Sequence, residues 1–173
     1  MANTTRQSPA GKTRGTPAQD ALQLLMADHR EVKAMFQQYQ KLADADKPDD
    51  ERTLLASQIC AALTVHTQIE EEILYPAARE VLTKDEDMVD EAYVEHASAK
   101  NLIAQIKDAD HDEPMYDAKV KVLGELIDHH VQEEETEFFP KLRKTSLDLD
   151  ALGAQLAERK TRLMAETDDV TTS

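Results

Sequence analysis

The sequence has no tryptophan, only four glycines and a single cysteine, Cys60, among 173 residues. One cysteine excludes an internal disulfide, and no cysteine pair is present to hold zinc or an iron–sulfur cluster. Cys60 lies among apolar residues, so a packing role is expected for it. The abundant residues are Ala, Leu, Glu, Lys and Gln, which favour helices over sheets. The composition therefore predicts an all-α protein.

Positive charge is also scarce, because 20 Lys and Arg residues face 35 Asp and Glu residues, for a formal net charge of -15. Nucleic acid and anionic membranes would be repelled, which argues against both as partners. No run of about 18 apolar residues occurs, so no segment is expected to span a membrane. The first fifteen residues contain no apolar stretch of signal-peptide length. We expect a soluble cytoplasmic protein, with an organelle transit peptide as the alternative.

The length of the chain suits one domain with its own core. We expect a disordered tail over residues 1–15 and an antiparallel up-down-up-down four-helix bundle over residues 16–145. A short additional helix over residues 146–166 is expected to pack on the bundle or on a partner subunit, where it would support a homodimer. Residues 167–173 are expected to fray.

Capping residues, polar runs and prolines indicate where the helices begin and end. Pro76 is expected to kink or loosen the second helix, which runs on to Leu82. The fourth helix is expected to end near Lys144. The remaining expected boundaries are helix starts at Thr16–Gln19, Thr83–Glu86 and Ser146, and turns at 44–50 and 108–114.

Apolar residues recur at alternating steps of three and four along all four expected bundle helices, which marks the face of each helix that turns inward. Each of these apolar seams contains one histidine. The four inward histidines are His29, His66, His96 and His130.

The segment 65–76 returns as residues 129–140. Each copy has a histidine, a glutamate four residues later, two large apolar residues and a proline ten residues after the histidine. Side chains at i and i+4 lie on one face of a helix, about 6 Å apart. His66 with Glu70, and His130 with Glu134, therefore each offer one imidazole and one carboxylate to the same point.

The repeat indicates a duplicated helical hairpin, with His29 and His96 67 residues apart and His66 and His130 64 residues apart. All four histidines lie at similar distances from the nearest loops, at about 1.5 Å of rise per residue. In an antiparallel bundle they therefore meet in one layer.

Four imidazoles and two carboxylates in an apolar core would be costly without a cation. Nitrogen and oxygen donors without thiolate suit iron, manganese or zinc. Zinc is satisfied by four ligands, whereas six ligands with two bridging glutamates favour two iron ions, joined by an oxo or hydroxo bridge. One position on each iron would remain open for dioxygen, nitric oxide or peroxide.

A single histidine more often has an ordinary core or surface role, and we assign His111 and His129 to that role. The other glutamates near the two repeats are interpreted as a solvated face or as supports for the ligands. Glu135 is the main rival of Glu134, because a slight helix distortion could present it instead. The glutamates in this group are Glu71, Glu72, Glu133, Glu135 and Glu137.

These residues resemble the hemerythrin-like, or HHE cation-binding, domain family over residues 20–142. The family motif is His, then His-x-x-x-Glu, then His, then His-x-x-x-Glu, matched at His29, His66 with Glu70, His96, and His130 with Glu134. The resemblance implies an antiparallel four-helix bundle with a non-haem di-iron centre. The Glu-x-x-His motif of ferritin-like proteins is missing.

One departure from the family pattern concerns Lys100, which stands where oxygen-carrying hemerythrins have a fifth histidine ligand. This argues against reversible oxygen transport. Tyr39, Tyr93 or Glu31 are candidates for a replacement ligand. Related iron-repair proteins have a cysteine-bearing segment at the amino end, which this chain lacks.

Three functional hypotheses follow. The first is a di-iron protein that binds dioxygen or nitric oxide for sensing, scavenging or storage. The second is a di-iron enzyme that turns over peroxide or nitric oxide, although no seam residue resembles a dedicated general acid, base or nucleophile. The third is an iron-holding, iron-repair or interaction module that docks a partner through its last helix.

Overall fold

The computed structural model describes residues 19–45 and 49–171, with side chains over 19–45 and 50–166, and these residues form helices and no strand. The first hairpin consists of α1 (Ala21–Asp44) and α2 (Asp49–Ile69), which continues through η1 (Glu70–Leu74) into α3 (Tyr75–Val81). The second consists of α4 (Glu86–Asp108) and α5 (Tyr116–Glu133), which continues through η2 (Glu134–Phe138) into α6 (Phe139–Leu142). Helix α7 (Leu149–Thr171) follows.

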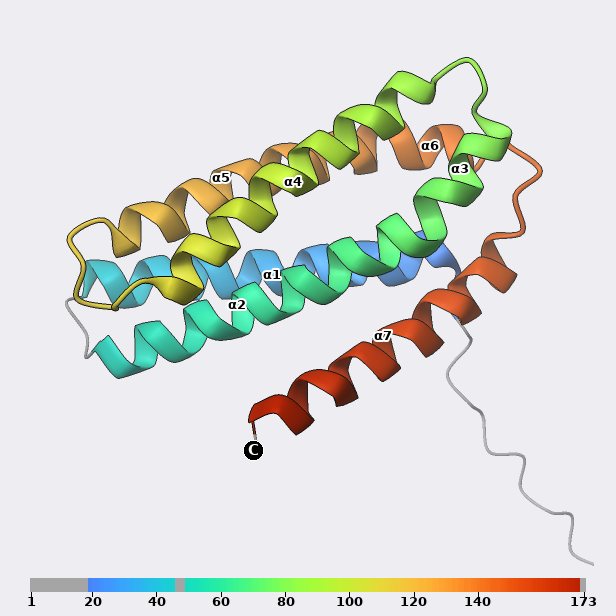
Figure 1. Cartoon of the computed structure of the whole chain (residues 1–173). Helices are drawn as coiled ribbons and strands as arrows, with labels where there is room; N and C mark the ends of the chain where they lie inside the picture. The colour runs from blue at the N-terminus through green and yellow to red at the C-terminus, as the bar shows by residue number, and fades with distance from the viewer. Residues whose placement is uncertain (1–18, 46–48, 172–173) are drawn as a thin grey trace, which may run out of the picture.

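The two hairpins pack side by side into an antiparallel four-helix bundle, and α7 lies outside it along α1 and α2 (Figure 1). This arrangement confirms the predicted fold class. No helix in the described part of the chain is long and apolar enough to cross a membrane.

Two apolar clusters fill the bundle, one toward each end. One contains Leu25 and Ile69, and the other contains Val32 and Leu63. The predicted site residues lie in sequence between these clusters, so a polar layer separates two apolar halves of the core. The apolar halves keep the layer away from water, which strengthens electrostatic interactions within it.

Helix α7 has 23 residues and begins at Leu149, so the predicted additional C-terminal helix is present, close to the expected range 146–166. Its stripe of Leu152, Leu156 and Leu163 is buried in the same apolar cluster as Leu25. Gly153 permits the close contact with the start of α1, because a Cβ atom there would lie 2.6 Å from the Gln19 carbonyl oxygen. The stripe predicted from sequence thus covers the protein's own bundle.

Several helix starts differ from the predicted ones. The tail over residues 1–15 and the cap at Thr16 lie outside the described residues, and α1 begins at Ala21 with a capping box between Asp20 and Gln23. The predicted capping box placed the cap at Thr83 and Glu86 three residues later, which is wrong, because α4 begins at Glu86. Its cap residue is Asp85, which makes no capping side-chain hydrogen bond. Asp85 instead accepts a hydrogen bond from Lys141. The side chain of Asp148, rather than Ser146, accepts from the Ala151 amide at the start of α7.

Candidate metal centre

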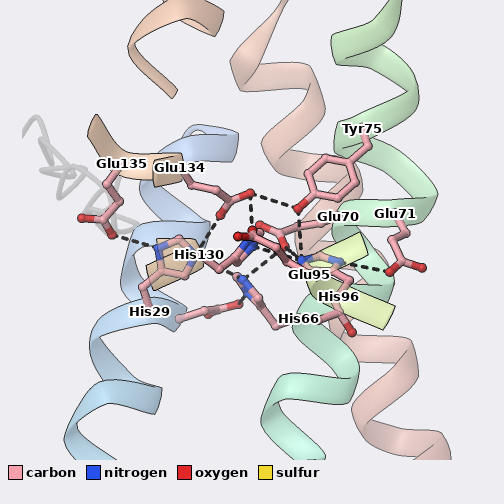
Figure 2. A network of polar contacts seen from close by, with 12 residues as sticks. His29, His66, Glu70, Glu71, Tyr75, Glu95, His96, His130, Glu134 and Glu135 are labelled. Carbon is pink, nitrogen blue, oxygen red and sulfur yellow. Dashed lines mark hydrogen bonds and ion pairs between the residues drawn. The ribbon is translucent and has the colours of Figure 1, made fainter. Parts of the chain in front are cut away.

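The structure brings the six predicted residues together in the polar layer, and each is at most 5% exposed. The Nε2 atoms of His29 and His66 are 3.2 Å apart, and those of His96 and His130 are 3.1 Å apart. The histidines therefore form two pairs, one from each hairpin, with Nε2 atoms directed inward (Figure 2).

The two glutamates lie between these pairs. Glu70 Oε2 is 3.3 Å from Nε2 of both His66 and His96. Glu134 Oε2 is 3.3 Å from His29 Nε2, and its Oε1 is 3.6 Å from His130 Nε2. Each carboxylate thus reaches one histidine of each pair, which is the placement that two bridging carboxylates require.

The Nδ1 atom of every one of these histidines faces a further carboxylate. Such a partner holds the proton on Nδ1, fixes the ring and leaves the Nε2 lone pair free for a metal ion. The distances are 2.8 Å for His29 to Glu135, 3.4 Å for His66 to Asp28, 3.0 Å for His96 to Glu71 and 2.6 Å for His130 to Glu95.

Sequence reasoning left Asp28 and Glu95 without a role, although a signal was present. Each directly precedes a seam histidine in its own copy of the hairpin. Asp28 also accepts a hydrogen bond of 2.5 Å from Lys160 Nζ, so α7 reaches the edge of the layer. Lys100 similarly contacts Glu71 at 2.6 Å, and its side chain is 46% exposed.

A π-helical turn begins at each of the two inward glutamates, Glu70 and Glu134. The Tyr75 amide donates to the Glu70 carbonyl, and the Phe139 amide donates to the Glu134 carbonyl, five residues apart in each case. A proline follows each turn, and its missing amide prevents the α-helical bond there. Glu134 stays inside the layer, while Glu135 lies at its edge.

The π turn brings in a residue that the sequence analysis missed. Five residues along an α-helix point roughly 140° away from the starting residue, but an i to i+5 bond places them one above the other. Tyr75 is therefore fully buried beside the layer. Its hydroxyl donates to Glu134 Oε1 at 3.0 Å and lies 3.1 Å from His96 Nε2.

Phe139 is the counterpart of Tyr75 in the second repeat, and its ring stacks on His29 with centroids 5.9 Å apart. The layer is therefore chemically asymmetric, with a hydroxyl beside His96 and a phenyl ring beside His29. The three predicted replacement ligands lie elsewhere. Tyr39 donates to Asp117, Tyr93 donates to the Glu71 carbonyl, and Glu31 is exposed.

Three of the four carboxylate oxygens of Glu70 and Glu134 lack a hydrogen-bond donor among the described residues. Both oxygens of Glu70, and Oε2 of Glu134, are buried and accept no hydrogen bond within the described part of the chain. A buried carboxylate without donors is costly, and a cation between the carboxylates and the imidazoles removes the cost. The donor set and these unsatisfied oxygens therefore fit a metal centre.

In the metal-free layer, burial and the neighbouring charges shift the pKa values of three side chains. Burial opposes a charge on His130, but Glu134 and Glu95 outweigh it and raise the pKa of His130 to about 9. Burial likewise opposes a charge on Glu134, yet His130 and His29 lower the pKa of Glu134 to about 2. Burial, Glu134 and Glu70 raise the pKa of Tyr75 well above its ordinary value, so its hydroxyl keeps the proton.

Comparison with known proteins gives consistent results. Residues 20–142 match the family described as hemerythrin HHE cation binding domain, the same range as the resemblance seen in the sequence. A crystal structure of an HHE cation-binding domain-containing protein from Mycobacterium kansasii superposes with a TM-score of 0.69 at 21% identity. It covers 85% of this chain and 88% of that one.

Curated relatives also match at the sequence level, two of them from Nostoc and Mycobacterium tuberculosis. A protein named DNA nickase from Nostoc is 30% identical over 133 residues, which cover 76% of this chain but only 36% of the nickase. This chain thus spans about a third of the length of that relative. An uncharacterized protein from Mycobacterium tuberculosis is 23% identical over 81% of this chain and 84% of its own length.

The family match covers most of the chain, and the fold and the buried His and Glu clusters agree with it. The chain belongs to the hemerythrin HHE cation-binding family.

Proposed function

We propose that the buried layer holds two iron ions and presents an open coordination position to dioxygen or nitric oxide. The observation that carries this proposal is the arrangement of two histidine pairs joined by Glu70 and Glu134. One ion would take His29 and His66, and the other His96 and His130. Both glutamates would bridge the ions, so each ion would have two nitrogen and two carboxylate oxygen donors.

The donor set supports iron over the alternatives. Zinc prefers a closed tetrahedral site, often with thiolate, and the layer contains no thiolate and more donors than one zinc ion uses. Magnesium and calcium favour oxygen donors, whereas four of the six donors here are imidazole nitrogens. When bound, the iron pair would supply reversible redox chemistry and affinity for small diatomic molecules.

The surroundings of the layer support a small ligand. A cavity of about 10 Å³ lies against the four histidines and is lined by apolar residues such as Val32, Leu63 and Ile127. This volume is close to that of one water-sized probe, so the space suits a diatomic molecule. The apolar lining favours an uncharged gas over an ion.

Turnover of peroxide or nitric oxide is the second candidate, and Tyr75 favours it. Its buried hydroxyl is a donor beside His96 and Glu134, whereas its counterpart Phe139, which stacks on His29, has no hydroxyl. Tyr75 would position a bound molecule and hold a proton at its hydroxyl oxygen. An electron donor would still be required for nitric oxide reduction.

An interaction module that docks through α7 has lost its main support, because the apolar stripe of that helix is buried on its own bundle. A homodimer through α7 stays a prediction without that support, as does a cytoplasmic location. The net charge of -15 gives no basis for extending the nickase name to this chain.

Metal analysis with an absorption spectrum tests the proposal. We expect about two irons per chain, as the ligand count implies, with oxo-bridge bands in the near ultraviolet. His66→Ala and Glu134→Ala should each lower the iron content. The reduced protein should change its iron absorption bands when titrated with dioxygen or nitric oxide. Zinc in freshly purified protein, full iron in both variants, or unchanged bands with either gas would contradict the proposal.

A further inference from the structure

A second group of metal-type donors lies outside the buried layer, on the face where α4 meets α5. His129 and Glu133 stand four residues apart on α5, with His129 Nε2 3.3 Å from Glu133 Oε1. Glu95 of α4 brings its Oε1 to 3.6 Å from the same nitrogen. One donor atom from each of the three residues lies within 4.8 Å of the others. The three will be called the outer cluster.

Glu95 links the outer cluster to the buried layer. While Oε1 faces His129, Oε2 lies 2.6 Å from Nδ1 of His130, one of the six inner residues. The side chains become more buried along this line, from 61% exposed at His129 to 14% at Glu95 and 3% at His130. The donors therefore form a continuous series from solvent to the centre.

A groove of about 80 Å³ adjoins this series, and its lining includes Glu95 and Glu133 of the outer cluster but not His129. Glu95 and Glu133 line its outer part, and His130 and Glu134 line its inner part. Glu134 is only 3% exposed, and its buried Oε2 accepts no hydrogen bond within the described residues. An unsatisfied buried carboxylate at the inner end of a groove points to a cation as what the groove admits.

The charges along the groove distinguish it from the other approach to the layer. The titratable residues that line it are five glutamates and His130, with no lysine or arginine among the described lining residues. The larger groove between α1 and α5, which reaches His29, is lined by Arg30, Lys33 and Lys121 as well as acids. A cleft of one charge sign concentrates ions of the opposite sign and raises their association rate.

We propose that His129, Glu133 and Glu95 form an outer divalent-cation site through which Fe²⁺ is taken up into the buried centre. This inference rests on the proposed function, because it requires an inner centre that holds iron. One imidazole nitrogen and two carboxylate oxygens suit Fe²⁺, Mn²⁺ or Zn²⁺. Three protein donors leave water on the ion, so the ion exchanges readily. Glu95 and then Glu134 provide the next carboxylates inward.

The test measures how fast the metal-free protein takes up iron. Metal-free protein is mixed with Fe²⁺ without oxygen, and the iron protected from the chelator ferrozine is counted against time. The double variant His129→Ala, Glu133→Gln should load about tenfold more slowly than wild type, since such steering changes rates by 10-fold or more. Its final iron content should equal that of wild type.

Glu125→Gln is the matched control, because it removes one negative charge from an exposed position on the same helix outside this groove. It should load at the wild-type rate. An unchanged rate in the double variant, or an equal loss of rate in the control, would overturn the uptake site. A lower final iron content in a normally folded double variant would also overturn it, by making these residues part of the inner centre. Absence of protected iron in wild type would instead refute the proposed function itself.

Discussion

Replacing Glu70 by glutamine should have opposite effects in the metal-free and the metal-loaded protein. Glu70 is 0% exposed, and neither of its oxygens accepts a hydrogen bond. The Nε2 atoms of His66 and His96 each lie 3.3 Å from its Oε2. Glutamine keeps the shape and removes the charge, so the substitution isolates the electrostatic role of this carboxylate.

The metal-free variant should be at least as stable as metal-free wild type. A buried carboxylate without hydrogen-bond donors is destabilised by its lost hydration, and a neutral amide of the same shape loses far less on burial. Contacts with the two imidazoles offset part of that gain, so an increase between zero and about 2 kcal/mol is expected.

In the metal-loaded protein, Glu70→Gln should instead lower the stability of the fold. Bound metal stabilises the folded state by about 4 kcal/mol when free metal exceeds Kd a thousandfold. For a chain of this length, that corresponds to a rise in Tm of about 8–16 °C. A neutral amide makes a poor bridge between two cations, so the Glu70→Gln protein should lose most of this rise.

Paired thermal unfolding with and without Fe²⁺ under anaerobic conditions measures both effects. Glu80→Gln, the same substitution at an exposed position of α3, should leave both midpoints unchanged. A metal-free Glu70→Gln protein much less stable than wild type would mean that the histidines alone satisfy this carboxylate. Full retention of the metal-induced rise would mean that Glu70 is not a ligand.

Three further predictions concern stability. Tyr75→Phe removes the hydrogen bond to Glu134 and should lower the unfolding free energy of the metal-free protein by about 1.5–3 kcal/mol in urea. After loading, the variant should still bind two irons; unchanged stability of the metal-free variant would contradict the role of this hydrogen bond. Gly153→Ala should cost about 1–3 kcal/mol in the same assay, because the new methyl would lie 2.9 Å from the backbone carbon of Asp20; a more stable variant would show that α7 shifts freely. Burial opposes protonation of His130, but Glu134 outweighs it and raises the pKa of His130 to about 9. Protonated His130 therefore contributes its full stabilisation of the metal-free fold below pH 6.5, and this contribution is lost as pH rises through 9. The thermal unfolding midpoint of the metal-free protein should therefore fall as pH rises from 6.5 to 9, while that of the iron-loaded protein should not. The same pH dependence in both forms would contradict the stabilising role of protonated His130.

The sequence by itself determined the fold and the membership of the inner layer. The spacing of His66 with Glu70, and of His130 with Glu134, is local to one helix, and helical periodicity converts it directly into a shared face. The repeat then fixes the depth of both pairs, because rise per residue is constant. His29 and His96 followed from their positions on the apolar seams of the other two helices.

Only the tertiary structure decided how the layer is supported. Asp28, Glu71, Glu95 and Glu135 reach their histidines from other helices, and such contacts depend on the rotation and depth of each helix in the bundle. Tyr75 was out of phase for an α-helix and joined the layer because the π turn changed the phase of the residues after Glu70. The spacing in the sequence identifies the six inward residues. Contacts between helices determine the hydrogen-bond partners of the histidines, since no single helix contains both partners of those hydrogen bonds.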